Sequence, residues 1–167
     1  AVGKGALDAN TTGSNNVAFG VDCLGANTTG EENVAMAPNN ALGSNTTGTG
    51  NTALGNQALM ANTTADNNTA VGRYALTANT TGTANVAVGR EALDANTTGS
   101  NNTALGDSAL TAATTASGNV AVGKNCLLSC TTGAENVGMG YQALNAVTTS
   151  SYSTAMGNEA LILNTAD

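Results

Sequence analysis

The sequence contains no histidine and no tryptophan, and it has only one phenylalanine and three tyrosines among 167 residues. Without histidine, the chain lacks the usual general base of a catalytic triad. With aromatic residues at 2%, it also lacks the flat aromatic surfaces on which ring-shaped ligands stack. We therefore predict no catalytic residues, and we expect that the chain is not an enzyme.

Charged residues are also scarce, at 9%, and the eleven acidic side chains outnumber the four basic ones to give a net charge of −7. A chain so poor in lysine and arginine is not expected to bind nucleic acid. The acidic residues do not recur as the aspartates of calcium-binding repeats do, so we expect no metal site and no cofactor. No run approaches the ~18 apolar residues of a membrane span, and membrane insertion is not expected.

Cysteine is limited to Cys23, Cys126 and Cys130, whose spacing matches no zinc or redox motif. Cys23 and Cys126 fall where other parts of the sequence have alanine, which favours small, buried thiols. A disulfide between Cys126 and Cys130, or a bond between chains, stays an alternative.

The sequence consists of ten copies of one repeat motif, for example AVGREALDANTTGSNNT from Ala87 to Thr103. The step between copies is 17 residues, except for one step of 18 with its extra residue near 37–40, where the only proline lies. We read residues 1–167 as a single repeat domain and expect it to be a segment of a longer fibre protein. The copies begin at Ala1, Ala18, Ala35, Ala53, Ala70, Ala87, Ala104, Ala121, Gly138 and Ala155.

Two columns of the repeat hardly vary. A leucine occurs in every copy and is predicted to form a core ladder, and an asparagine precedes most copies and is predicted to form a ladder of amides. The leucines are Leu7, Leu24, Leu42, Leu59, Leu76, Leu93, Leu110, Leu127, Leu144 and Leu161. The asparagines are Asn16, Asn33, Asn51, Asn68, Asn85, Asn102, Asn119 and Asn136.

A fixed short period is typical of a stacked solenoid. Seventeen residues are too few for a helical repeat, and Asn-Thr-Thr-Gly is poor helix sequence. The repeat therefore predicts an all-β fold, a parallel β-solenoid or β-roll of ten 17-residue coils. A coil that contains one helical turn is the alternative.

Alternation along Val86-Ala87-Val88-Gly89 places the two valines on one face and the alanine and glycine on the other. We expect the valine face to fill the coil. The alanine and glycine face stays small in nearly every copy, which predicts that another chain packs closely against it. This inter-chain face comprises Ala18, Gly20, Ala53, Gly55, Ala70, Gly72, Ala87, Gly89, Ala104, Gly106, Ala121 and Gly123.

Two short motifs of the repeat resemble the head repeats of trimeric autotransporter adhesins. They are Asn-Val-Ala-Val-Gly (85–89 and 119–123) and Asn-Thr-Ala-Leu-Gly (51–55 and 102–106). When the following Ala-Leu-x-Ala-Asn-Thr-Thr-Gly is included, the longer motif is similar to repeat shafts of phage tail-fibre proteins that end in a self-cleaving chaperone domain. The resemblance covers the whole chain. It implies a homotrimeric parallel β-roll with small residues at the three-fold interface.

These observations predict a structural, adhesive fibre shaft on a phage tail or bacterial cell surface, outside the cell. Its role would be to hold a receptor-binding tip away from its anchor, and a host receptor would be contacted by parts outside this segment. Its partner would be further copies of itself. The alternatives are a subunit of a self-assembling extracellular filament and, as a minor one, an ice-binding solenoid that exposes threonine.

Overall fold

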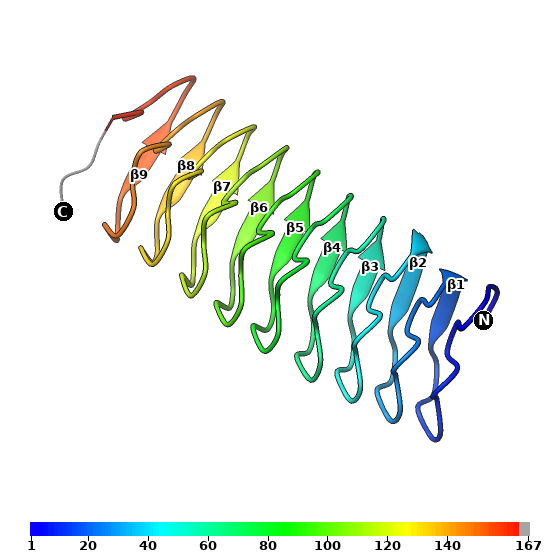
Figure 1. The fold of residues 1–167 in the computed structure, drawn as a ribbon. Helices are drawn as coiled ribbons and strands as arrows, with labels where there is room; N and C mark the ends of the chain where they lie inside the picture. Colours follow the sequence, from blue (N-terminus) through cyan, green and yellow to red (C-terminus); the bar gives the residue numbers. More distant parts are fainter. Residues whose placement is uncertain (164–167) are drawn as a thin grey trace.

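The computed structural model describes residues 1–163, in which nine short strands form one parallel sheet in sequence order. Successive turns of the chain stack along one axis, and each turn contributes one strand (Figure 1). The predicted all-β parallel solenoid is confirmed, and the helical alternative is wrong because residues 1–163 contain no helix. The strands are β1 Val17–Val21, β2 Val34–Asn39, β3 Thr52–Leu54, β4 Thr69–Val71, β5 Val86–Val88, β6 Thr103–Leu105, β7 Val120–Val122, β8 Val137–Met139 and β9 Thr154–Met156.

The strands pair in the register of the repeat, so that each residue lies beside its equivalent in the next copy. Ala70 of β4, for example, is the partner of Ala53 on one side and Ala87 on the other. The extra residue of the 18-residue step lies in β2 and shifts the register of β2 against β1, since Phe19 pairs with Met36 but Val21 pairs with Asn39. The last residues of the predicted repeat domain, 164–167, lie outside the described part of the chain. Within the described part, no helix is long and apolar enough to cross a bilayer.

The leucine column forms a buried ladder, as predicted. From Leu24 to Leu144 these side chains are fully buried, whereas Leu7 is half-buried and Leu161 is exposed, each in an end coil. Every leucine of the column also has a positive φ, between 50° and 55°, which turns the chain sharply at that point. A β-branched residue is strongly disfavoured in this left-handed conformation. Both packing and backbone geometry therefore explain why leucine, and not valine or isoleucine, recurs.

The assignment of the two strand faces from the sequence is wrong. The strand alanines point into the coil and are 0–2% exposed, while the larger residues on either side of them point outward. The coil is thin, and the leucine column on the opposite wall occupies the space that faces the strand, so only a methyl group fits there. The affected alanines are Ala18, Ala53, Ala70, Ala87, Ala104 and Ala121.

The glycines assigned to the inter-chain face are likewise required by packing within the chain. They have φ between 127° and 142°, a conformation that side chains rarely adopt. A methyl group on Gly89 would also lie 2.6 Å from the carbonyl carbon of Gly106 in the next coil. The same holds along the column, so close stacking of successive coils explains Gly20, Gly55, Gly72, Gly89, Gly106 and Gly123.

Two successive coils show how tightly the interior is filled. Gly138 stands where other strands have the inward alanine, and Cys126 stands where most coils have an alanine on the facing wall. A methyl group on Gly138 would lie 2.5 Å from the Cys126 sulfur and 3.5 Å from Cδ1 of Leu127. Cys126 is therefore accommodated beside a glycine of the next coil, whereas Cys23 keeps Ala35 at the equivalent position, in the coil that contains the extra residue.

This compensation predicts a strong coupling between the two positions. Gly138→Ala alone is expected to destabilise the chain by about 1–3 kcal/mol, because it overpacks the coil. The double variant Cys126→Ala/Gly138→Ala restores the alanine pair of the other coils and is expected to return close to wild-type stability. Urea unfolding of the two single variants and the double variant measures this coupling. Additive effects would show that the two side chains do not compete for one space.

The predicted asparagine ladder is present, and its members are hydrogen-bonded from coil to coil. Asn85, for example, donates from its backbone N (3.0 Å) and from Nδ2 (3.2 Å) to Oδ1 of Asn68. Its Nδ2 also donates to the carbonyl oxygen of Gly99, at 2.9 Å. The series ends at Ser153, whose backbone N donates to Oδ1 of Asn136 at 2.9 Å, so the last amide oxygen is satisfied.

A second asparagine ladder was not predicted. Asn62 Nδ2 donates to Oδ1 of Asn45 at 2.9 Å and to the carbonyl oxygen of Ala65 at 3.0 Å, and this pattern repeats from coil to coil. The sequence signal for it was the asparagine that opens each Asn-Thr-Thr corner. The members are Asn10, Asn27, Asn45, Asn62, Asn79 and Asn96, of which all but the first are fully buried.

Candidate functional site

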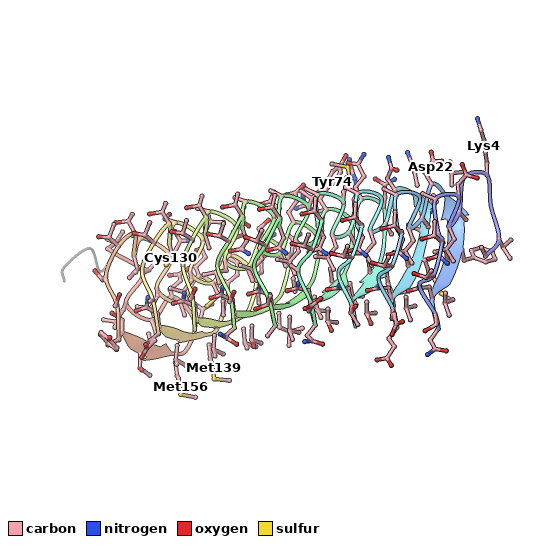
Figure 2. The ribbon with its side chains drawn as sticks, turned by 90° about the horizontal axis from the view of Figure 1, so that it is seen from below. Lys4, Asp22, Tyr74, Cys130, Met139 and Met156 are labelled. Atoms are coloured by element: carbon pink, nitrogen blue, oxygen red, sulfur yellow. The ribbon has the colours of Figure 1, made fainter. Side chains whose placement is uncertain are left out.

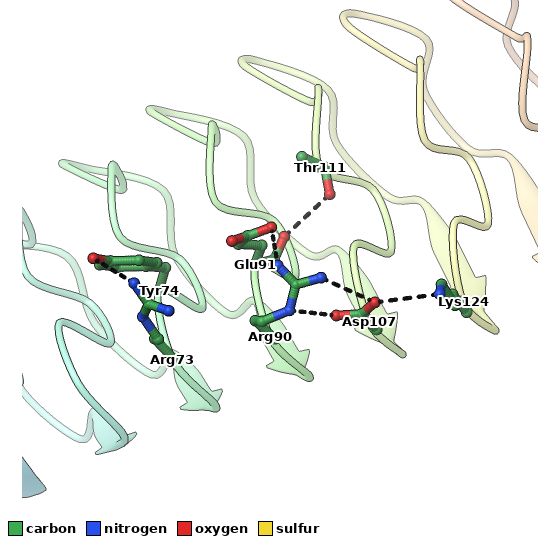
Figure 3. Close-up of polar contacts among 7 residues, drawn as sticks. All are labelled: Arg73, Tyr74, Arg90, Glu91, Asp107, Thr111 and Lys124. Atoms are coloured by element: carbon green, nitrogen blue, oxygen red, sulfur yellow. Dashed lines mark hydrogen bonds and ion pairs between the residues drawn. The ribbon is translucent and has the colours of Figure 1, made fainter.

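Charged side chains gather at one place along the rod, beside the ends of the middle strands (Figure 3). Arg90 lies 2.9 Å from Asp107 (Nε to Oδ1) and 2.7 Å from Glu91 (Nη1 to Oε2), and Lys124 Nζ lies 3.9 Å from Asp107 Oδ2. The hydrogen bond and charge of Asp107 raise the pKa of Arg90. Burial, with the nearby charge of Glu91, raises the pKa of Asp94. Exposed ion pairs of this kind link successive coils but add little stability.

The three cysteines are free thiols inside the coil, so the disulfide between Cys126 and Cys130 is not formed. Burial raises the pKa of both thiols to about 11. At neutral pH they are therefore protonated, poor nucleophiles. Cys23 is also fully buried, which leaves no cysteine sulfur at the surface to bond to another chain. Across residues 1–163, no three histidine, cysteine, aspartate or glutamate side chains come together as a metal site would require.

The threonine pairs present one regular hydroxyl column to solvent. The first threonine of each pair is tied to the coil: Thr97 Oγ1, for instance, donates to the carbonyl oxygen of Thr114 at 3.0 Å. The second, such as Thr98, is exposed. A single exposed column is narrower than the flat threonine array on which an ice-binding surface depends.

The most distinctive surface is the outer side of the sheet, which we call the strand face. It consists of the residues before and after the inward alanine or glycine of each strand, in two columns that contain no charged residue. The first column is Val17, Val34, Thr52, Thr69, Val86, Thr103, Val120, Val137 and Thr154. The second is Phe19, Met36, Leu54, Val71, Val88, Leu105, Val122, Met139 and Met156.

Many of these apolar side chains are exposed to water. Phe19 is 58% exposed, Leu105 46% and Met156 68%. Figure 2 shows Met139 and Met156 projecting away from the sheet, while Cys130 lies within the coil. Lys4, Asp22 and Tyr74 lie along the opposite side of this view. Most of the exposed large apolar side chains of residues 1–163 thus lie on the strand face, and Tyr141, Tyr152 and Leu163 are exposed elsewhere.

The strand face extends along the whole sheet. Neighbouring strands lie ~4.8 Å apart, so nine of them give a band about 40 Å long. Contiguous apolar surfaces of this extent are uncommon on proteins that remain single in water and usually mark an interaction site. Since residues 1–163 form no pocket, the strand face is the candidate functional site.

Comparison with known proteins gives no further guide to its role. No protein-family model, curated protein or solved structure matches the chain.

Proposed function

We propose that this chain is a non-enzymatic structural shaft, a solenoid of ten 17-residue coils that associates as a homotrimer through its strand face. The shaft belongs to an adhesive fibre on a phage tail or bacterial surface. It holds a receptor-binding tip, which lies outside this segment, away from the anchor. The resemblance to adhesin head repeats and tail-fibre shafts suggests this setting.

The observation that carries the proposal is the uncharged strand face on a chain with a net charge of −7. Apolar area removed from water contributes roughly 25 cal/mol per Å². Covering this band would therefore stabilise the assembly, whereas the remaining sides of the rod present mainly threonine, serine and charged groups that water solvates well.

A copy of the same chain is the partner that fits this surface best. Its side chains repeat at the same ~4.8 Å spacing, so two strand faces can interlock along their whole length. In a parallel arrangement, residues of equal height meet, and Phe19 packs near Phe19 just as Leu105 packs near Leu105. Three chains around one axis turn all three strand faces inward and leave the charged edge at Arg90 and Lys124 outside.

The internal architecture suits a mechanical role. Strand hydrogen bonds and the first asparagine ladder bind successive coils to one another, and the second ladder adds to them from Asn10 to Asn96. Bending or stretching the rod would disturb many equivalent bonds at once. Such a rod transmits position and force, and it needs no catalytic group.

The test is the mass of the 167-residue chain in solution, measured by sedimentation equilibrium. We expect one discrete species at three times the 16.2 kDa chain mass. Leu105→Glu, which places a charge on the strand face, is expected to shift the protein to monomers. The matched control, Thr98→Glu on the exposed threonine column, should leave the mass unchanged.

Other outcomes decide between the alternatives. An open-ended mass distribution would favour the filament over the shaft. A folded wild-type monomer at micromolar concentration would overturn the proposed assembly.

A further inference from the structure

The second asparagine ladder stops inside the protein, and its last member has an unpaired oxygen. Along the ladder, the Nδ2 of each asparagine donates to the Oδ1 of the preceding one, as Asn96 does to Asn79 at 2.8 Å. The next residue of the column is Ala113, which has no amide to offer. Oδ1 of Asn96 is therefore a buried acceptor without a hydrogen-bond partner.

A second acceptor beside it has also lost a donor. In the coil of Asn96, the carbonyl oxygen of Gly99 accepts from two amides, Asn85 at 2.9 Å and Asn96 at 3.0 Å. In the next coil, the equivalent carbonyl of Ala116 accepts from Asn102 at 2.8 Å, but position 113 supplies no second donor. The single Nδ2 that asparagine would carry at position 113 is the donor that both acceptors lack.

The backbone at this coil follows the same path as in its neighbours. Ala113 N donates to the carbonyl oxygen of Leu110 at 3.3 Å, as Asn96 N does to that of Leu93 at 3.2 Å. The Cβ of Ala113 therefore occupies the place of an asparagine Cβ, and only the carboxamide beyond it is missing. Ala113 is fully buried, which separates this space from bulk water.

We infer that this position is a closed binding site for one water molecule, which donates one hydrogen to Asn96 Oδ1 and the other to the Ala116 carbonyl oxygen. Replacing asparagine with alanine frees roughly the volume that one water molecule occupies in the liquid, ~30 Å³. A buried water needs at least two polar partners, and both acceptors require a donor here.

The occupant must be neutral and must be a donor. The site contains two uncharged oxygens and no carboxylate, so a buried cation would lose its hydration without compensation. Cys130, the next residue of the column, does not serve as the donor because its sulfur bonds to the carbonyl oxygen of Gly133, at 3.4 Å.

A high-resolution crystal structure of the 167-residue chain tests the site directly. We expect one ordered water within hydrogen-bond distance of both Asn96 Oδ1 and the Ala116 carbonyl oxygen. A dry site, or an Asn96 oxygen bonded to a protein donor, would overturn the inference. In Asn96→Ala, the unpaired oxygen becomes that of Asn79, and the water is expected one coil earlier, beside Asn79 and Gly99.

Two variants of similar size separate hydrogen bonding from simple filling of space. Ala113→Asn supplies the missing amide, so it should displace the water and raise the melting temperature. Ala113→Val fills the same space with methyl groups, which the column accepts at Val147, and should lower the melting temperature by leaving Asn96 Oδ1 unpaired. A valine variant at least as stable as the asparagine variant would contradict a bound water.

Discussion

Replacing Ala87 with leucine is expected to unfold the coil around β5, with a loss of about 3 kcal/mol or more in the free energy of unfolding. Ala87 is fully buried, and its methyl group points at the facing wall of the same chain. Overpacking by one or two methylenes typically costs about 1–3 kcal/mol, and leucine adds three carbon atoms to a space fitted for one. Thermal unfolding followed by circular dichroism measures the loss.

The neighbouring residue provides the control. Val88 points outward from the same strand, and leucine already occupies its column at Leu54 and Leu105. Val88→Leu is therefore expected to change the melting temperature little. If Ala87→Leu were tolerated as well as Val88→Leu, the inward direction of the strand alanines would be refuted.

Removing an amide from the middle of the second asparagine ladder should have the next largest effect. Asn62 donates to Asn45 and to the Ala65 carbonyl, and it accepts from Asn79 at 3.1 Å. Asn62→Ala deletes all three bonds and leaves Oδ1 of Asn45 buried without a donor. At about 1 kcal/mol per bond, we expect a loss of about 3 kcal/mol, since a bound water can take the place of the amide donor to Oδ1 of Asn45, as inferred for Asn96.

Asn96→Ala is the matched comparison, because Asn96 is the last member of that ladder. It removes two donated bonds, to Asn79 and to the Gly99 carbonyl, but its own Oδ1 accepts none. The unpaired oxygen only moves to Asn79, so the expected loss is about 2 kcal/mol. Urea unfolding of both variants tests the order, and equal losses would show that the ladder does not act through directional hydrogen bonds.

The sequence was sufficient to predict the all-β parallel solenoid. The fixed period indicated stacked coils, the composition of the Asn-Thr-Thr-Gly corner argued against helices, and the unvarying Leu93 column indicated the interior. The asparagine column of Asn85 was predicted to be an amide ladder because stacking places equivalent side chains within hydrogen-bond reach. These features depend only on the repeat.

The direction of the strand could not be obtained in the same way. Alternation shows that Val86 and Val88 share a face, but it does not show which face is inside. The range of side-chain sizes in each column was the signal that distinguishes the outward face from the inward one. The outward column ranges from valine to methionine to Phe19, which solvent or a deformable interface can accommodate. The inward column is almost always alanine, and its one change, Gly138, lies against Cys126 of the preceding coil.

The unpaired acceptor at the end of the second asparagine ladder could not be predicted from the sequence either. Ala113, Cys130 and Val147 interrupt the column, but only the direction of each amide bond shows that Asn96 is left with an acceptor and not a donor unpaired. That direction comes from the path of the chain at the corner.

Oxidative cross-linking through an added cysteine tests most directly whether the strand faces of separate chains meet. The native thiols are buried and do not interfere. With Leu105→Cys, we expect rapid disulfide formation between chains, seen as a covalent dimer on a non-reducing gel. Thr98→Cys on the threonine column should form no disulfide and run as a single chain on the same gel. Equal linking at both positions, or no linking at position 105 in a folded protein, would contradict the account.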